Sequence, residues 1–421
     1  MIHYDDDALT TEILNSDKFT YEVAIKFGPY CDVGHTTVSI EDFYYGNDFT
    51  THWLYEDQIV SMQSTDSVYD SNPCIGAAVA KTLTAKVFVG SYATTTFLGG
   101  AREVWVATRC WKSHEPNRKT DWHYIGPFIE DRRNYDPQTG VLTVYASDDM
   151  ARSDTAYMKI VEAEDGQISY GRHCFHGTTD QEQLAIVIGD IAQLMGLNGT
   201  TTATEQMMSG MYLPRPDDGT TMRDIIRYAA GACGCNARIR WAVKEEQYSS
   251  YVEYGYLEFV PFNFNKETFD IGTNYVSVSL GDDVSSTAYW DVAMLDCADG
   301  NDHVSTHQAQ DKVVARFQMS NPMGTETLCN SVLSFIKQTG DGVNEWDYRG
   351  INVQSAVLDI RAEAGDKVYV SIPRYDGSYD IHPYIIGTII RDYDHLCAAS
   401  IQAPDLSRRT IDPYLLEDWQ Q

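Results

Sequence analysis

Histidine and cysteine side chains gather at two places in this chain, and side chains of these types bind metal ions. His173, Cys174 and His176 lie in one short stretch, and a single glycine separates Cys233 from Cys235. Local zinc sites usually leave two or more residues between paired cysteines, so this spacing suits a zinc knuckle poorly. We therefore expect ordinary loop and core residues here rather than a metal site.

Carboxylates form a second group of candidates. The run 296–302 contains Asp296, Asp299, Asn301 and Asp302 around a glycine. It lacks both the alternating ligand spacing of a calcium loop and the glutamate at its twelfth position. The run is therefore interpreted as an acidic turn.

Two adjacent acidic pairs, Asp148-Asp149 and Asp282-Asp283, could in principle flank a glycosidic bond. In a chain with 61 acidic residues, however, adjacent pairs arise by chance, and we expect both to belong to the solvated surface. The sequence also lacks the G-x-S-x-G and H-E-x-x-H motifs and phosphate-binding glycine loops. We expect no catalytic, cofactor-binding or metal-binding residues, hence no enzyme, and we assign no interface residues.

The overall charge limits the partners. Asp and Glu number 61 against 31 Lys and Arg, a formal net charge of −30, and the cations do not cluster beyond pairs such as Arg132-Arg133. Nucleic-acid binding needs clustered cations, so it is not expected. No apolar run reaches the ~20 residues of a membrane span, and the acidic N-terminus does not resemble a signal peptide. The nine irregularly spaced cysteines fit reduced thiols and synthesis in a cytoplasm.

The elements that must position these residues are mostly strands at both ends of the chain. Alternating apolar residues predict strands at 20–27, 82–89, 104–111 and 141–147, and the turn signal 136–140 precedes the last of them. The one candidate helix in this first part covers 75–83. In the last third, 367–373 and 379–392 read as strands around an Asp-Gly turn, and one helix is expected at 320–338.

The middle of the chain has a helical period. An apolar stripe predicts a helix from Thr179, capped by Thr179 and Glu182 and ending at Gly196. A second helix is capped by Thr221 and Asp224 and ends at Gly234. Strands follow it at 236–243 and 254–262. The predicted fold is β-rich α+β and multidomain, with two β-barrel-like domains flanking an α/β middle domain.

The order of several segments resembles the tail-hub family of phages and contractile injection systems. That family comprises the central baseplate hub of contractile-tailed phages, the N-terminal part of tail-tip proteins and the hub half of type VI secretion spikes. The strongest match is 219–242, where Thr221, Arg223 and Asp224 open a helix of small residues that leads into a strand. The other matching segments follow the same order and are 75–88, 122–154, 319–336 and 362–404.

The resemblance implies a homotrimer in which two tube domains per subunit form a ring around a channel. The domains would be 1–150, a first barrel-like hub domain; 151–260, the middle domain; 261–405, a second hub domain; and 406–421, a tail. The implied partners are the tail tube or distal tail protein, the tape-measure protein and tip, spike or fibre proteins, and the implied location is the virion. Net negative charge suggests an acidic channel that DNA passes without sticking.

Two alternatives remain open at the level of sequence. A tail-tip adhesin would use the 28 Tyr and 8 Trp to bind a host glycan or surface protein, because sugars and subunits stack on the same rings. A tail-associated wall hydrolase is a weaker alternative without a catalytic motif. Relatives often carry a further C-terminal domain, so cell-wall cutting or receptor binding is expected on another subunit. The segment 410–421 is either a docking peptide or a terminus packed on its own barrel.

Overall fold

The computed structural model describes part of the chain, and the account below concerns that part alone. The described residues are 7–14, 16, 18–29, 53–54, 57–69, 76–89, 102–120, 123–157, 160–162, 168–170, 181–217, 219–246, 249–261, 268–280, 292–296, 302–306, 314–318, 323, 350–359, 361–392, 398–403 and 417–418.

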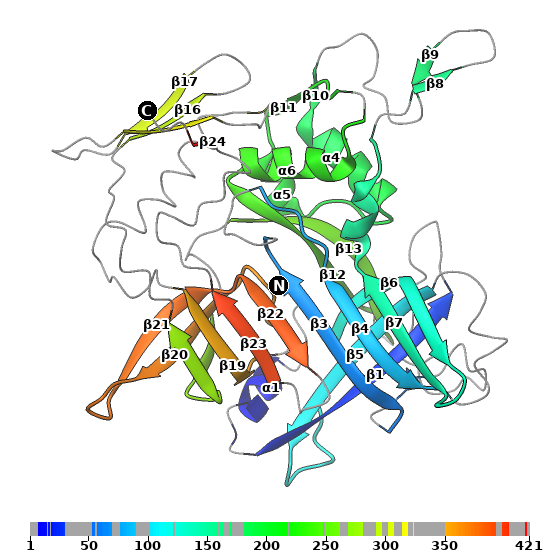
Figure 1. Cartoon of the computed structure of the whole chain (residues 1–421), viewed down its shortest axis with the longest axis vertical. Coiled ribbons are helices and arrows are strands. Elements are labelled where there is room, and N and C mark those ends of the chain that lie inside the picture. Colours follow the sequence, from blue (N-terminus) through cyan, green and yellow to red (C-terminus); the bar gives the residue numbers. More distant parts are fainter. Residues whose placement is uncertain are drawn as a thin grey trace.

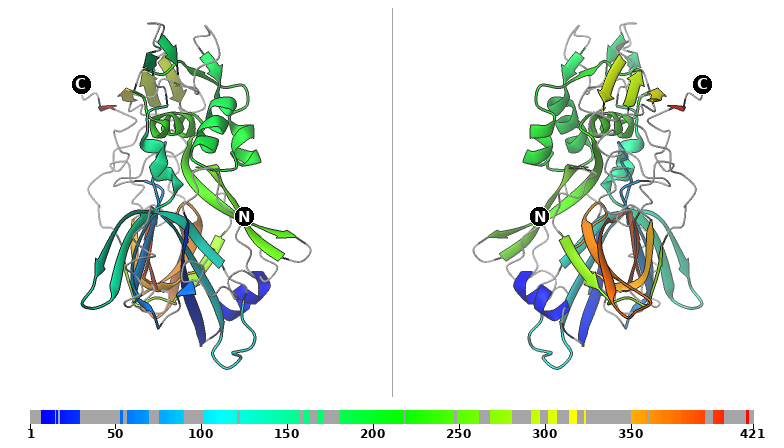
Figure 2. Two further views of the ribbon diagram at one scale, coloured as in Figure 1. Left: turned by 90° about the vertical axis from the view of Figure 1, so that its right-hand side faces the viewer. Right: turned by 90° about the vertical axis from the view of Figure 1, so that its left-hand side faces the viewer.

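One 11-stranded sheet runs through the lower half of the molecule (Figure 1). Its strands follow the order β15-β19-β23-β22-β3-β4-β7-β6-β5-β1-β2, and neighbouring strands are antiparallel. Figure 2 shows the strands curling round, so that the sheet has the form of a half-barrel. The described fold is therefore β-rich with few helices.

The sheet combines strands from both ends of the chain. The early strands are β1 (Phe19–Pro29), β2 (Trp53–Leu54), β3 (Ile59–Ser67), β4 (Thr82–Phe88), β5 (Arg102–Lys112), β6 (His123–Asp136) and β7 (Val141–Ser147). The late strands are β15 (Ser277–Leu280), β19 (Ile351–Val357), β22 (Thr388–Asp392) and β23 (Ala398–Ala403). The two sets meet where β3 pairs with β22, from Thr388 opposite Ser67 to Asp392 opposite Gln63. This pairing is called the seam.

Each part of the sheet has its own core on the inner face, because alternate side chains of a strand point to the same side. In β4 and β7 the inward residues are buried, among them Leu83, Val87 and Val144. Helix α1 (Asp7–Leu14) adds Ile13 to this core. The late strands enclose a second core with Val353, Ile389 and Ile401, which β20 (Lys367–Pro373) and β21 (Tyr379–Ile385) help to cover.

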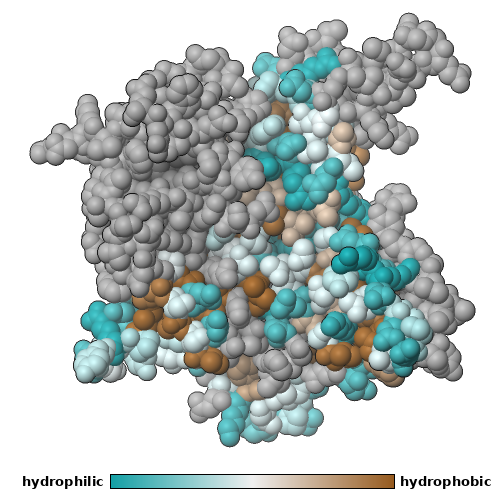
Figure 3. Space-filling model, viewed as in Figure 1, coloured by the Kyte–Doolittle hydropathy of each residue, from teal (hydrophilic) through white to brown (hydrophobic). Residues whose placement is uncertain are grey.

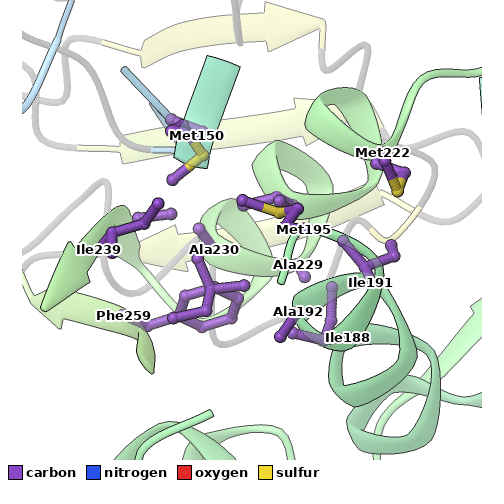
Figure 4. Packing of buried hydrophobic residues seen from close by; sticks show 14 of the residues in the cluster. Met150, Ile188, Ile191, Ala192, Met195, Met222, Ala229, Ala230, Ile239 and Phe259 are labelled. Carbon is purple, nitrogen blue, oxygen red and sulfur yellow. The ribbon is translucent and has the colours of Figure 1, made fainter. Parts of the chain in front are cut away.

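Helices lie above the sheet in Figure 1 and build a third core. They are the short 3-10 helix η2 (Asp149–Asp154), α4 (Leu184–Leu194), α5 (Thr202–Met207) and α6 (Met222–Ala232). The long hairpin of β12 (Cys235–Glu246) and β13 (Ser249–Pro261) packs against them. Figure 4 shows Met150, Met195, Ala230, Ile239 and Phe259 converging in this core.

The remaining strands form small sheets. They are β8 (Ile160–Glu162) with β9 (Ile168–Tyr170), β10 (Gln181–Gln183) with β11 (Tyr212–Pro214), β14 (Thr268–Gly272) beside β20, and β16 (Val292–Asp296) with β17 (Asp302–Thr306), β18 (Val314–Gln318) and β24 (Glu417–Asp418). Within the described part, no helix is long and apolar enough to cross a bilayer.

Most sequence predictions of elements are confirmed. Strands occupy the predicted positions in both end regions, and α6 has the predicted capping box, in which Thr221 and Asp224 cap each other's backbone amides. The turn before β7 is also present, because the Asp136 carboxylate accepts hydrogen bonds from the Gln138 amide and the Thr139 hydroxyl. The helix predicted at 320–338 lies outside the described residues, except Met323, which is in a turn.

Two helix predictions were wrong, and one helix was missed. The candidate helix 75–83 is absent: residues 76–81 are irregular, and β4 begins at Thr82. Helix α4 begins at Leu184, because 181–183 instead pair with β11 and Gln183 provides no side-chain cap. Thr179 lies outside the described residues. The first part does contain a helix, α1, which is only eight residues long and was not predicted.

Candidate functional site: a charged junction

A cluster of buried and half-buried ion pairs lies where the two ends of the chain and the middle part meet. We call it the junction. It consists of Asp66, Lys81, Arg238, Arg240, Glu258, Glu363 and Asp366. Lys81 precedes β4, Arg238 lies on β12 and Glu363 precedes β20, so each main part of the fold contributes at least one charge.

Lys81 is the cation that links the early and late strands. Its Nζ atom lies 2.8 Å from Glu363 Oε1 and 3.6 Å from Asp66 Oδ2, and its side chain is only 10% exposed. Burial alone would lower the pKa of Lys81, but the charges of Asp66 and Glu363 outweigh burial and raise it. Lys81 is therefore a fixed cation and cannot act as a general base near neutral pH.

Arg238 links β12 to the late part of the chain. Its guanidinium contacts Glu258 through Nε at 2.8 Å and Glu363 through Nη2 at 3.5 Å, and Nη1 donates to the Ala364 carbonyl at 2.9 Å. Burial disfavours charge on Glu363, but Lys81 and then Arg238 outweigh it and lower the pKa of Glu363 to about 2. The carboxylate is thus ionised at every physiological pH, which suits a structural ion pair and not an acid catalyst.

Arg223 makes a second fastening beside the junction. It is the second residue of α6, two positions after the Thr221 cap, so its position is fixed by the start of that helix. Its guanidinium donates to the carbonyls of Ala78 and Met150, each at 2.8 Å, and pairs with Asp154. One side chain therefore holds together the approach to β4, the helix η2 and the helix α6.

At the seam, the backbone of Gly387 lies close to the ring of Tyr69. Gly387 precedes β22, and its carbonyl accepts a hydrogen bond from the Val68 amide at 3.0 Å. A Cβ atom at Gly387 would lie 2.6 Å from Tyr69 Cζ, so the position has no room for a side chain. Ser67 and Thr388 also share a hydrogen bond between their hydroxyls at 2.9 Å.

The acidic pair Asp148-Asp149 is buried, which corrects the expectation that it is part of the solvated surface. Asp148 is 1% exposed and caps η2, with Oδ1 accepting from the Met150 amide at 3.1 Å. Asp149 pairs with Arg152, whose Nη1 also donates to the Met195 carbonyl. Burial, and secondarily the charge of Asp149, raises the pKa of Asp148 to about 7, against the opposing charge of Lys81.

The other candidates from the sequence do not come together. Cys233 and Cys235 lie against Met211 and Met207, and burial raises the pKa of the Cys233 thiol to about 12. Such a thiol is not a ready metal ligand, because metal binding requires the thiolate. Asp296 and Asp302 are partners at the end of the β16–β17 pairing, and Asp299 and Asn301 lie outside the described residues. His173, Cys174, His176, Asp282 and Asp283 lie outside the described residues.

Sequence reasoning missed the junction. Lys81, Arg238 and Glu363 are ordinary charged residues next to predicted strands, and nothing local distinguishes them from surface charges. Their partners lie far away in the chain: 282 positions separate Lys81 from Glu363. Within the described residues, no group of three or more His, Cys, Asp or Glu is placed to hold a metal ion.

Comparison with known proteins gives similarity at the level of structure. No family model and no curated protein sequence matches the chain. A tail protein from Neisseria meningitidis MC58 has a TM-score of 0.47 and 8% identity, with 94% of this chain and 99% of that one covered. The 43 kDa tail protein of prophage MuSo2 from Shewanella oneidensis has a TM-score of 0.45 and 10% identity, covering 93% and 100%.

A third similar structure is a PdpA-VgrG complex from Francisella, with a TM-score of 0.47 and 10% identity, covering 96% of this chain and 55% of that one. These are proteins of the same kind as those that the sequence resembles. Identities of this order and TM-scores below 0.5 leave the function to be judged from the chain itself.

Proposed function

We propose that this protein is a structural hub subunit of a phage-type tail tip or baseplate, without enzymatic activity. The observation that carries the proposal is the contact between the segments on which the sequence resemblance rests. Arg223, from segment 219–242, touches Ala78 of segment 75–88 and Met150 of segment 122–154. Arg238, also from 219–242, touches Glu363 and Ala364 of segment 362–404. The segments whose order along the chain resembles that of the hub family are thus in direct contact in the fold.

The mechanical demands on a hub explain why such fastening would be selected. A subunit that joins a tube to a tip must transmit force without its parts shifting. Buried, hydrogen-bonded ion pairs favour a single arrangement, because any other arrangement leaves a charge unpaired in a poorly solvated place. The continuous sheet across the seam adds backbone hydrogen bonds to the same connection.

In detail, the proposal is a homotrimer whose two tube domains, 1–150 and 261–405, alternate to form a ring, with 151–260 as the middle domain and 406–421 as a tail. The ring would join a hexameric tail tube or distal tail protein to the tip, spike or fibre proteins. It would leave a channel for DNA or the tape-measure protein. The protein would be made in the host cytoplasm and assembled into the virion.

The test is to image the isolated full chain by negative-stain electron microscopy at micromolar concentration, with light scattering for the mass. The proposal predicts threefold rings with a stain-filled centre and a mass of three chains, each of 47.4 kDa. Compact monomers at every concentration, alone and with the cognate tube protein, would overturn it.

An adhesin is the second candidate, because one hairpin exposes apolar side chains. Tyr375, Tyr379 and Ile381, at the β20–β21 turn and along β21, are 108%, 55% and 63% exposed. Exposed rings of this kind stack on sugars. The adhesin would be favoured if host cells retain the isolated protein and do not retain a variant in which Tyr375 and Tyr379 are changed to Ser. If host cells retain neither protein, the hub is favoured.

A further inference from the structure

Four sulfur-containing side chains lie together among α5, α6 and β12. They are Met207 at the end of α5, Met211 four positions later, Cys233 directly after α6, and Cys235 at the start of β12. The Cys233 Sγ atom lies 3.9 Å from Met211 Sδ, and the Cys235 Sγ atom lies 3.7 Å from Met207 Sδ. Cys235 Sγ also donates to the Cys233 carbonyl at 3.3 Å, which connects the two pairs. We call these four residues the sulfur cluster.

The composition of the chain does not by itself lead to such a group. There are nine cysteines and 12 methionines among 421 residues, so the neighbours of a thiol in a core should mostly be carbon atoms. In the sulfur cluster, each of two thiols instead faces a thioether. Thiols and thioethers pack as apolar groups, but together they are also the soft ligands that bind Cu(I).

The spacing of the sulfur atoms suits a shared metal ion. A sulfur ligand lies about 2.3 Å from its metal, as in zinc sites, so two such ligands at a tetrahedral angle are roughly 3.8 Å apart. The two sulfur pairs already have this separation, at 3.9 and 3.7 Å. An ion that binds either pair therefore needs no separation of its two sulfur atoms.

The backbone of the sulfur cluster is fixed, and its side chains are partly accessible. The Cys233 amide bonds the last turn of α6, and the Met211 carbonyl accepts from the Leu184 amide at 3.0 Å. Cys235 is buried, whereas Cys233, Met207 and Met211 are half-buried. Over the helices, Figure 3 shows tan and brown apolar side chains at the surface among teal ones. A small ion can thus approach the sulfur atoms from outside, and their inner side is dry.

The charge of the ion distinguishes copper from zinc at this place. Burial raises the pKa of the Cys233 thiol to about 12, so a site that needs several thiolates does not form readily. Zinc takes thiolate, imidazole and carboxylate ligands. For Cu(I), one thiolate from the cysteine pair cancels the charge of the ion, and thioethers bind it as neutral donors. The complex then has no net charge in its apolar surroundings, which avoids the cost of burying one.

We propose that the sulfur cluster is a binding site for Cu(I). Binding forms a bond from Cu(I) to one cysteine thiolate and further bonds to the Met207 and Met211 thioethers, and it releases one thiol proton to the solvent. The ion enters and stays as Cu(I), so no electron is transferred. The spacing of Cys233 and Cys235 in the sequence does not predict this site, because the two methionines join them only in the fold. The site does not depend on the proposed hub function.

The site is tested by competition for Cu(I) between the full chain and the chelator bicinchoninate, without oxygen and followed by absorbance. Met207→Leu/Met211→Leu removes both thioethers, keeps all nine cysteines and nearly conserves side-chain volume. Met62→Leu/Met222→Leu makes the same change at two buried methionines outside the cluster and is the control. Even indirect partners of a metal contribute about tenfold in affinity. We therefore expect the cluster variant to bind Cu(I) roughly tenfold or more weakly than the other two proteins.

The same titration with Zn²⁺ separates loss of ligands from a change in the fold. Because thioethers are not zinc ligands, the unsubstituted chain and both variants should bind Zn²⁺ equally. Equal binding of Cu(I) by the unsubstituted chain and both variants would overturn the proposal. So would a loss of Zn²⁺ affinity in the cluster variant as large as its loss of Cu(I) affinity.

X-ray absorption at the copper edge identifies the ligands directly. With one Cu(I) added per chain, we expect sulfur neighbours alone, at about 2.3 Å. Nitrogen neighbours would place the ion on histidines and reject the sulfur cluster as its site. Neither measurement requires the chain to assemble, so the copper site and the hub function are tested separately.

Discussion

The Nζ atom of Lys81 lies 2.8 Å from Oε1 of Glu363, although 282 positions separate the two residues in the chain. Each is held by further charges, Lys81 by Asp66 and Glu363 by Arg238. The contact therefore belongs to a network that ties the early strands, the late strands and the β12–β13 hairpin together. Its contribution to stability can be measured by changing one partner at a time.

Changing Glu363 to Gln should destabilise the fold. The substitution leaves Lys81 and Arg238 with less compensating charge, and breaking a buried pair costs about 3–5 kcal/mol. Denaturant unfolding of Glu363→Gln, Lys81→Met and the double variant gives the coupling energy between them. We expect the double variant to lose less than the sum of the single losses. Strict additivity would show that the two residues do not interact.

The same network has a pH signature. The pKa of Glu363 is lowered to about 2 from 4.5, so the stabilisation is complete above pH 4.5 and is lost as the pH falls towards 2. The stability difference between the unsubstituted chain and Glu363→Gln should shrink over this range. Arg374→Met, which breaks an exposed ion pair with Asp380, is the control. Its stability should stay close to that of the unsubstituted chain both above pH 4.5 and near pH 2.

Asp148 should have the opposite pH dependence. Its pKa in the fold is about 7 against an ordinary 3.8, so between these values the folded state binds more protons than the unfolded chain. The free energy of unfolding therefore falls as the pH rises through this window. Asp148→Asn retains an oxygen that can accept from Met150 and should be more stable at pH 8, by up to about 4 kcal/mol, with no gain below pH 4.

A thermal unfolding series from pH 4 to 8 tests this prediction. Asp217→Asn makes the same chemical change on an exposed residue and should leave the pH profile unaltered. A parallel profile for Asp148→Asn and the unsubstituted chain would mean that Asp148 is already charged at low pH in the fold.

Gly387→Ala should loosen the seam. The added methyl group meets the Tyr69 ring, and overpacking of this kind costs about 1–3 kcal/mol. Gly189→Ala, within α4 and with nothing near its Cβ, should instead stabilise by about 0.5–1 kcal/mol. Melting temperatures of the two variants should therefore shift in opposite directions. A lower melting temperature for both would point to a general sensitivity to alanine.

Arg223→Lys should weaken the contact between α6, η2 and the approach to β4. The guanidinium of Arg223 contacts the carbonyls of Ala78 and Met150 and the carboxylate of Asp154 at the same time. The compact ammonium group of a lysine cannot make all three contacts from one position. Leaving buried carbonyls without donors costs about 1–3 kcal/mol. Limited proteolysis should cut the variant faster than the unsubstituted chain, while Arg374→Lys should be cut at the original rate. Equal cleavage rates for the unsubstituted chain and the two variants would show that the three simultaneous contacts of Arg223 are dispensable.

Local signals explain which elements were predictable. The α6 cap depends on Thr221 and Asp224, which are three positions apart, and the β7 strand on its own alternation. The sequence prediction placed the start of α4 too early. Residues 181–183 form a strand in which Gln181 pairs with Pro214, and this pairing prevails over the local capping pattern. The burial of Asp148 and Asp149 was missed because the cation Lys81 and the surrounding core come from remote segments. The seam could not be predicted for the same reason, because β3 and β22 come from distant parts of the chain.

The seam also sets an order in time. Ser67 and its acceptor Gly387 are 320 positions apart, so β3 has no β22 to pair with until nearly the whole chain has been synthesised. At about 5–20 residues per second, that interval lasts roughly 15–65 s. During it the β3 edge is an open template on which another nascent chain can add a strand. Translation speed and the crowding of ribosomes on one message thus become determinants of how much of this protein reaches its native form.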